Sequence, residues 1–226
     1  MKFKTVAYKG SKRKLLTDIE LIAKDIGART IFDGFSGTGI VSAYLRSQGY
    51  QVDGNDISES ASIFGNVFLR GYDPGVVSDV ISLLNHLEPT EGWLTQNYSG
   101  NRKRKIRGTG GEVQDRPMGY TKSNAMKLDA ARDFIETLEL NEKDKNALIF
   151  SIVLAADSVF NNSNDQKSSL KEWQAKSLRE VKFEAPTLVS GFDGLQYKGS
   201  ILDVDVGSYD MVYLDPPYTH GVLYES

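Results

Sequence analysis

A strand, a glycine turn, a helix and a second strand follow one another between residues 30 and 56, and this pattern constrains the fold most. Residues 30–35 are rich in β-forming types, and a Ser-Gly-Thr-Gly turn at 36–39 leads into a helical pattern that runs to Leu45. A second strand is predicted at residues 51–54. Because parallel strands need a crossover of this kind, usually a helix, the sequence predicts an α/β fold with a parallel sheet.

The α/β pattern then gives way to a long stretch with helical periodicity. Residues 91–120, rich in Gly, Asn, Arg and Lys, are predicted to be loop, and residues 171–178 to form a short helix. Strand patterns return at residues 199–204 and 209–214. The other helices are expected at residues 15–26, 59–69, 76–87, 127–138 and 141–159. The sequence therefore predicts a sheet domain, residues 1–59 and 197–226, interrupted by a mainly helical insertion, residues 60–196.

Composition excludes several kinds of protein and of site. The 226 residues contain no cysteine and only two histidines, which excludes a disulfide scaffold, a thiolate zinc site and a cysteine nucleophile and argues against a multi-histidine metal site. The longest apolar stretch, residues 147–156, is about half of a membrane span, and the N-terminus lacks the apolar core of a signal peptide. We therefore expect a soluble, cytoplasmic protein that uses neither a membrane nor a metal.

The net charge of −3 hides a basic segment inside the predicted insertion. Residues 100–127 contain eight Lys and Arg residues against two acidic ones, a surplus of six. Five of these cations lie within six residues: Arg102, Lys103, Arg104, Lys105 and Arg107. A segment of this kind can follow a nucleic-acid backbone, with an affinity that falls steeply with salt, although a solvated charged loop has the same composition.

The glycine turn favours a nucleoside ligand. Without side chains at Gly37 and Gly39, a ligand can approach the backbone closely. The turn lacks both the Lys-Ser/Thr ending of a P-loop and the third glycine of the dinucleotide fingerprint, and taken alone it also fits a purely structural role. Asp56, which lies 17 residues beyond Gly39 at the end of the next strand, can accept hydrogen bonds from both hydroxyls of a ribose.

A second motif, Asp215-Pro216-Pro217-Tyr218, directly follows the last predicted strand. The two prolines make a stiff corner at the carboxyl end of the sheet, where open α/β folds bind their ligands. The Asp215 carboxylate and the Pro216 carbonyl are hydrogen-bond acceptors, and Tyr218 adds a flat ring. Two acceptors and a stacking ring suit a planar group that carries an NH2, such as adenine.

The order of these motifs resembles that of the Dam-like, D12 class of DNA N6-adenine methyltransferases. The basic N-terminal loop around Tyr8 and Lys12, the glycine turn, Asp56, a long insertion and the Asp215-Pro216 corner follow one another as in that family, from about residue 5 to residue 219. Within the insertion, segments 120–125, 128–132, 155–162 and 170–173 are similar to those of restriction-modification members. The resemblance implies a Rossmann-like, S-adenosylmethionine-dependent methyltransferase sheet and an inserted target-recognition domain.

The resemblance also assigns the cofactor S-adenosylmethionine to residues around the carboxyl edge. Tyr8 would pack on the cofactor, Asp56 would hold its ribose, and Asp203, with Asp205 as the neighbouring alternative, would face its adenine. The full expected cofactor set is Tyr8, Lys12, Asp33, Phe35, Gly37, Gly39, Asp56, Asp203 and Asp215.

The implied reaction is site-specific methylation of adenine N6 in double-stranded DNA, in a restriction-modification or phage setting. The target base would leave the duplex and stack on Tyr218. Hydrogen bonds from its NH2 group to Asp215 and Pro216 would localise the nitrogen lone pair for direct transfer. The catalytic residues are therefore expected to be Asp215, Pro216, Pro217 and Tyr218.

Two alternatives remain open from the sequence. The first is a methyltransferase that acts on RNA adenine or on a protein glutamine, although protein-glutamine enzymes usually carry Asn at the position of Asp215. The second is a non-catalytic fragment or DNA-binding subunit, because methyltransferases of this fold have further strands after the position of Asp215, and only eleven residues follow it here. We therefore expect a C-terminally incomplete enzyme with an unprotected sheet edge at 211–214, weak cofactor binding and little activity unless a second polypeptide complements it.

Overall fold

The computed structural model describes residues 3–6, 12–105, 113–162, 170 and 172–216. The chain divides into two compact units. The sheet unit comprises Met1–Pro74, Asn141–Phe150 and Pro186–Ser226, and the helical unit comprises Gly75–Leu140 and Ser151–Ala185.

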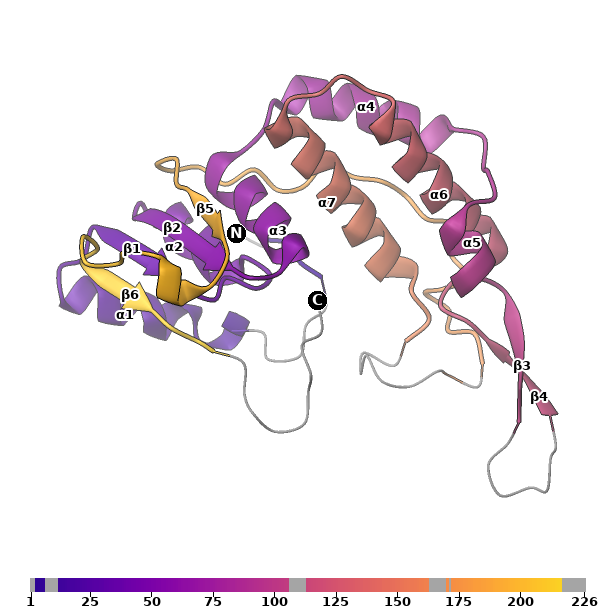
Figure 1. The fold of residues 1–226 in the computed structure, drawn as a ribbon, viewed down its shortest axis with the longest axis horizontal. Helices are drawn as coiled ribbons and strands as arrows, with labels where there is room; N and C mark the ends of the chain where they lie inside the picture. The colour runs from indigo at the N-terminus through magenta and orange to yellow at the C-terminus, as the bar shows by residue number, and fades with distance from the viewer. Residues whose placement is uncertain (1–2, 7–11, 106–112, 163–169, 171, 217–226) are drawn as a thin grey trace. The chain divides into compact units, whose positions relative to one another are not determined.

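Parallel strands form the centre of the sheet unit (Figure 1). The described strands follow the order β5-β2-β1-β6, with β5 at Gln196–Lys198, β2 at Gln51–Asp56, β1 at Thr30–Asp33 and β6 at Met211–Tyr213. Every pairing in this sheet is parallel, so the carboxyl ends of the strands meet at one edge. This confirms the predicted parallel α/β sheet, and β6 has one strand neighbour, β1, among the described residues.

Helices of the sheet unit bury the apolar strand residues. The unit contains η1 (Lys12–Lys14), α1 (Leu16–Asp25), α2 (Ile40–Ser47) and α3 (Glu59–Arg70). Phe32 on β1 and Phe68 on α3 are both fully buried. The Phe68 ring meets that of Phe150 edge-on at 5.4 Å between centroids, which adds a directional aromatic contact to the burial of apolar area.

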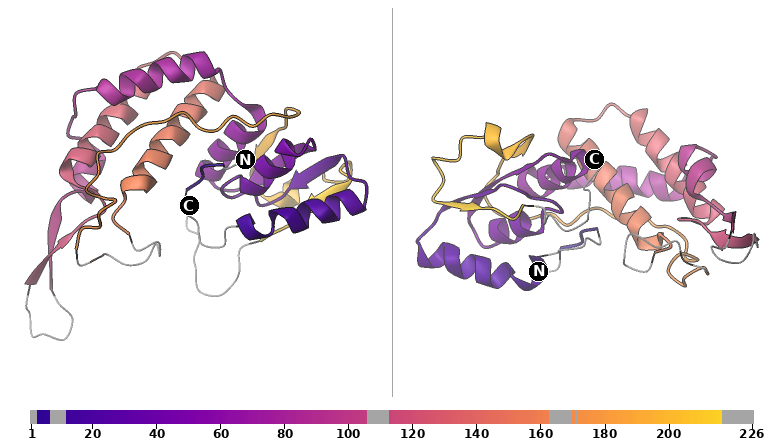
Figure 2. Two further views of the ribbon diagram at one scale, coloured as in Figure 1. Left: turned by 180° about the vertical axis from the view of Figure 1, so that it is seen from behind. Right: turned by 60° about the horizontal axis from the view of Figure 1, so that its bottom comes forward.

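The helical unit is built from helices and one hairpin. Its helices include α4 (Pro74–His86), α5 (Trp93–Tyr98), α6 (Lys122–Glu136) and the second half of α7 (Glu142–Val159). Strands β3 (Asn101–Lys105) and β4 (Val113–Pro117) pair antiparallel and project away from the helices of this unit (Figures 1 and 2). Leu84, Leu128 and Ile135 are buried in its core.

Two buried polar side chains fix loops of the helical unit. Asp129 on α6 accepts hydrogen bonds from the backbone N–H groups of Gly92, Leu94 and Thr95 and from the Thr95 hydroxyl, at 2.6–3.0 Å. Asn124, also on α6, donates to the carbonyl oxygens of Ser177 and Arg179 and accepts from Val181 N–H. Asp129 therefore ties the start of α5 to α6, and Asn124 ties the segment around residues 177–181 to the same helix.

The structure corrects several predictions for individual segments. Residues 91–120 were expected to be loop but contain α5 and the β3–β4 hairpin, because the paired strands are stabilised across the chain rather than by apolar periodicity. Residues 172–178 form turns instead of a helix. The strand expected at 199–204 lies earlier, at Gln196–Lys198, and Ile201–Asp203 forms a 3-10 helix, η2.

The division into units differs from the predicted boundaries at residues 59/60 and 196/197. α3 belongs to the sheet unit because it packs on β2 and β5, and the first turns of α7 belong there as well. In the described part of the chain, no helix combines the length and the apolar character required to cross a membrane.

Candidate functional site

Three carboxylates lie at the carboxyl edge of the parallel sheet. Asp33 ends β1, Asp56 ends β2, and Asp215 lies two residues beyond the end of β6. The register pairs Asp33 with both Gly54 and Tyr213, so β1 and β6 end level with one another and β2 runs two residues further, to Asp56. The structure therefore brings together three residues that the sequence predicted for one site.

Asp33 is the most deeply buried of the three, with 1% of its surface exposed. Its Oδ2 accepts a 2.6 Å hydrogen bond from the Ser42 hydroxyl on α2. Burial raises the Asp33 pKa to about 6, the Ser42 hydrogen bond opposes this, and the charges of Asp56 and Asp215 add to the rise. The pKa of Asp33 is thus raised toward neutral pH, and a perturbed pKa of this kind is typical of functional sites.

The glycine turn between β1 and α2 requires glycine at Gly39. This residue has φ 71° and forms the N-cap of α2, and a Cβ there would lie 2.8 Å from Cδ2 of Phe68. Gly37 also has a positive φ, 51°, but a Cβ on it would meet nothing closer than 3.9 Å. The backbone at Gly37 is therefore open to a ligand, whereas Gly39 is needed for packing.

Asp56 is oriented by backbone groups of the same edge. Its Oδ2 accepts a 2.8 Å hydrogen bond from Gly37 N–H, and its Oδ1 accepts a 2.9 Å bond from Ser58 N–H. An ionised carboxylate has about four acceptor positions, so two hydrogen bonds do not saturate it. Asp56 links the end of β2 to the glycine turn and keeps acceptor capacity for ligand hydroxyls.

Lys12 forms an ion pair with Asp215, which the sequence did not predict as a contact. Lys12 Nζ lies 2.8 Å from Asp215 Oδ2, and the two side chains are 14% and 21% exposed. Both residues were expected in the site, but from different motifs more than 200 residues apart in the chain. The pair places the start of η1 next to the end of β6 and joins the lysine ammonium to the carboxylate by a charge-assisted contact.

Buried acceptor atoms without a hydrogen-bond partner gather on the strands of this edge. Among the described residues they are Asp33 Oδ1, Asn55 Oδ1 and Gln196 Oε1. They belong to β1, β2 and β5, which are neighbours in the sheet. Buried acceptors of this kind are costly unless a donor reaches them, so this edge suits a ligand or water that carries N–H or O–H groups. The sequence did not predict that Asn55 would carry an acceptor without a partner, and it indicated no role for Ser42 or Gln196. Only the tertiary structure shows that these side chains lie at this edge.

The remaining predicted residues of the sheet unit are less closely tied to the edge. Phe35 is half-buried in the glycine turn, and Asp203 is exposed at the end of η2. η2 packs close to the turn, since a Cβ on Gly34 would lie 3.1 Å from Cδ1 of Ile201. Asp205 accepts a hydrogen bond from Gly207 N–H. Pro216 is exposed next to Asp215, whereas Tyr8, Pro217 and Tyr218 lie outside the described residues.

The basic segment of the helical unit forms one side of the β3–β4 hairpin. Arg102 and Lys103 are exposed on β3, and Arg104 and Lys105 continue that strand. Arg102 is paired in register with Arg116 on β4. Arg107 lies outside the described residues. Like charges in opposed positions on paired strands repel one another.

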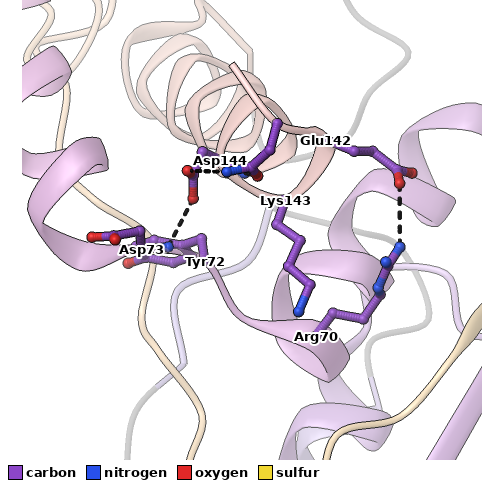
Figure 3. A pocket seen from close by; sticks show the side chains of 7 residues that line it. Arg70, Tyr72, Asp73, Glu142, Lys143 and Asp144 are labelled. Atoms are coloured by element: carbon purple, nitrogen blue, oxygen red, sulfur yellow. Dashed lines mark hydrogen bonds and ion pairs between the residues drawn. The ribbon is translucent and has the colours of Figure 1, made fainter.

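A polar pocket at the start of α7 belongs to the sheet unit as well (Figure 3). It has a volume of about 520 Å³. Asn141 and Asp144 cap the helix reciprocally, since Asn141 Oδ1 accepts from Asp144 N–H and Asp144 Oδ2 accepts from the Asn141 amide. Asp144 Oδ1 accepts a 2.7 Å hydrogen bond from Asp73 N–H, and Arg70 pairs with Glu142 at 3.3 Å. Because these groups bond to one another, we interpret the pocket as a structural junction.

No group of three His, Asp or Glu side chains that could hold a metal ion occurs in the described ranges. As far as it is described, the carboxyl edge offers hydrogen-bond acceptors, three carboxylates and the ammonium group of Lys12.

Comparison with known proteins gives relatives of one kind. The chain is 27% identical over 223 residues to the type II methyltransferase M.NlaIII of Neisseria lactamica, with 93% of this chain and 64% of the relative aligned. It is 27% identical to the modification methylase LlaI of Lactococcus lactis subsp. lactis, over 94% of this chain and 35% of the relative. It is 25% identical to the type II methyltransferase M.CviAII of Paramecium bursaria Chlorella virus 1, over 94% and 64%. The chain thus spans less than two thirds of the length of these relatives.

One family accounts for nearly the whole chain. The family described as D12 class N6 adenine-specific DNA methyltransferase matches residues 8–223, from the basic N-terminal loop to beyond the Asp215-Pro216 corner. The matched range includes the three carboxylates, the glycine turn and the hairpin. The resemblance inferred from the motifs is confirmed: this chain belongs to the D12 class of N6 adenine-specific DNA methyltransferases.

Proposed function

We propose that the chain carries the catalytic site of a site-specific DNA adenine methyltransferase that transfers a methyl group from S-adenosylmethionine to N6 of adenine. The observation that carries this proposal is the convergence of Asp33, Asp56 and the Lys12–Asp215 pair on one sheet edge. Family membership supports the reaction class, and the geometry supports the roles that we propose for individual residues.

The residues at the carboxyl edge fit S-adenosylmethionine. The cofactor carries an ammonium group, two ribose hydroxyls and a positive sulfonium, and its methyl group is the electrophile that the reaction uses. The unpartnered acceptor Asp33 Oδ1 suits the ammonium group, and Asp56 suits the ribose hydroxyls. Three carboxylates also make the edge attractive to a cation. The rest of the proposed cofactor set is Tyr8, Lys12, Phe35, Gly37, Gly39, Asp203 and Asp215.

Asp215 and Pro216 would accept hydrogen bonds from the NH2 group of the target adenine. An acceptor at each hydrogen withdraws the nitrogen lone pair from the ring and makes the nitrogen a better nucleophile. Lys12 would hold Asp215 Oδ2, so the carboxylate is oriented before the base arrives. We propose Lys12 as a positioning residue, while Pro217 and Tyr218 would form the rigid corner and the stacking surface for a flipped-out base.

The β3–β4 hairpin would bind DNA phosphates. Its strand β3 presents Arg102 and Lys103 on an exposed ladder, and the proposal extends to Arg104, Lys105 and Arg107. A projecting basic hairpin suits a groove of double-stranded DNA, and the helical unit that carries it would act as the target-recognition part.

A further polypeptide segment would complete the sheet beyond β6. β6 pairs with β1 on one side only among the described residues, and Leu214, which follows it, is 56% exposed. Exposed hydrophobic strand edges are normally covered or paired.

The test is methyl transfer from tritiated S-adenosylmethionine, with and without a candidate complementing segment. The expected product is N6-methyladenine in duplex DNA, with little turnover by the 226-residue chain alone. Transfer to RNA or protein in preference to duplex DNA would overturn the proposed substrate. Robust turnover by the chain alone would overturn the proposed completion of the sheet.

A further inference from the structure

Two large aromatic side chains are exposed on α5 of the helical unit, and the function proposed above gives them no role. Trp93 is 67% exposed and Tyr98 is 45% exposed. Their ring centroids lie 5.3 Å apart with the planes tilted by 45°. The two exposed side chains contact each other and so form a continuous apolar patch. Such patches mark interaction sites more often than single exposed side chains do.

Both ends of α5 are fixed, so the patch is presented rigidly. At the first turn, Asp129 accepts hydrogen bonds from Leu94 N–H and Thr95 N–H, both at less than 3.0 Å, directly after Trp93. At the other end, the Tyr98 carbonyl accepts a 3.0 Å bond from Tyr120 N–H. A buried carboxylate from α6 and a backbone bond therefore fix the backbone that carries the two rings before any partner binds, which lowers the entropy cost of binding.

The patch adjoins the basic hairpin. Two residues, Ser99 and Gly100, separate Tyr98 from the start of β3. Hydrogen bonds from Gly100 N–H to Tyr120 O and from Met118 N–H to Gly100 O continue the ladder of the hairpin down to α5. Figures 1 and 2 show α5 at the base of the hairpin in both views. Aromatic rings beside a row of cations are the combination that nucleic acids bind, since phosphates pair with the cations and bases or sugars pack on the rings.

We propose that Trp93 and Tyr98 form an aromatic contact for DNA, next to the phosphate-binding hairpin. This inference rests on the proposed function, and it adds two residues and a second kind of contact to it. The cations would provide a salt-dependent attraction, whereas the rings would provide a contact that depends little on salt. The two contributions can therefore be separated in one titration series.

The first experiment measures the affinity of the full chain for a DNA duplex at several salt concentrations. Trp93→Ala and Tyr98→Ala should each weaken binding by about 5- to 100-fold without changing the salt slope. Trp93→Phe should retain most of the affinity because it keeps a flat ring. Phe192→Ala removes an aromatic side chain of the sheet unit that is similarly exposed, at 63%, and should leave the affinity unchanged.

The second experiment follows Trp93 directly. The chain has two tryptophans, so Trp173→Phe leaves Trp93 as the sole tryptophan. Duplex DNA should quench its fluorescence and protect it from acrylamide. If DNA binds with a steep salt slope while Trp93 emission and the affinity of Trp93→Ala stay unchanged, this inference is wrong and the proposed function stands. If the patch instead drives self-association, seen as a smaller oligomer for Trp93→Ala with unchanged DNA binding, the inference is also overturned. Failure of the parent chain to bind DNA would overturn the proposed function itself.

Discussion

The buried carboxylate of Asp33 gives a quantitative prediction. Its pKa is raised from 3.8 to about 6. In the range between these values the folded chain keeps the Asp33 proton while the unfolded chain has lost it, so the free energy of unfolding falls as the pH rises. A shift of about 2 units corresponds to a loss of about 3 kcal/mol, which is complete above about pH 6.

Asp33→Asn removes this titration while keeping an oxygen that can accept the Ser42 hydrogen bond. The difference in unfolding free energy, variant minus parent, should therefore rise by about 3 kcal/mol between about pH 3.5 and pH 7. The buried NH2 of the new asparagine lowers the variant's stability by about 1–3 kcal/mol at every pH, which shifts the curve without changing its slope. Urea unfolding at a series of pH values measures the difference, and other titrating groups cancel in it.

Two controls make the reasoning refutable. Ser42→Ala removes a hydrogen bond that lowers the Asp33 pKa, so the window should extend to higher pH. Saturating S-adenosylmethionine should lower the Asp33 pKa and flatten the slope, because the ligand brings positive charge to the ionised carboxylate. A difference curve that is flat, or that falls with rising pH, would show that Asp33 is not held at a raised pKa.

Three further predictions follow from single contacts. Lys12→Ala should lower methyl transfer by the complemented enzyme by about 10- to 100-fold, because a charge-assisted bond to Asp215 is worth about 1.5–3 kcal/mol, and Lys12→Arg should recover part of the rate. Steady-state kinetics measures this, and unchanged rates would remove Lys12 from the site. Asp129→Ala should lower the unfolding free energy by about 3 kcal/mol, since the backbone N–H groups at the start of α5 lose their acceptor. A loss below about 1 kcal/mol in urea unfolding would contradict this. Replacing Arg102 and Lys103 together by Gln should reduce the salt slope of DNA binding by about 2, and an unchanged slope would place the DNA elsewhere.

The sequence was sufficient to predict the parts of the fold that depend on local pattern. The glycine turn, the strands on either side of it and α1 lie where the apolar spacing and the glycines predicted them. Asp56 and Asp215 could be predicted for one edge because residues that end parallel strands meet there, whereas Asp33 was expected in the site from the resemblance to the D12 class. These features follow from periods of about two and 3.6 residues and from the rule for parallel sheets.

The features that the sequence did not predict depend on contacts between distant segments. The β3–β4 hairpin lacks an apolar alternation, because its strands are polar and are stabilised by pairing across the chain, so its composition was typical of a loop. The Lys12–Asp215 pair joins opposite ends of the sequence. Asn55 and Gln196 became candidates only when burial left their side-chain oxygens without donors. Such groups look like ordinary polar residues until the chain is folded.

Equilibrium binding of S-adenosylmethionine tests the central claim, that the carboxyl edge of this sheet is the cofactor site. Isothermal titration calorimetry of the 226-residue chain, with and without the complementing segment, should give saturable binding that is strengthened by the segment. Asp56→Ala should weaken this binding by at least about tenfold, since each lost hydrogen bond to a charged acceptor is worth about 1.5–3 kcal/mol, while Asp25→Ala, which removes an exposed carboxylate at the end of α1, serves as a matched surface control. Binding that is absent in both preparations, or that is unaffected by Asp56→Ala, would contradict the account.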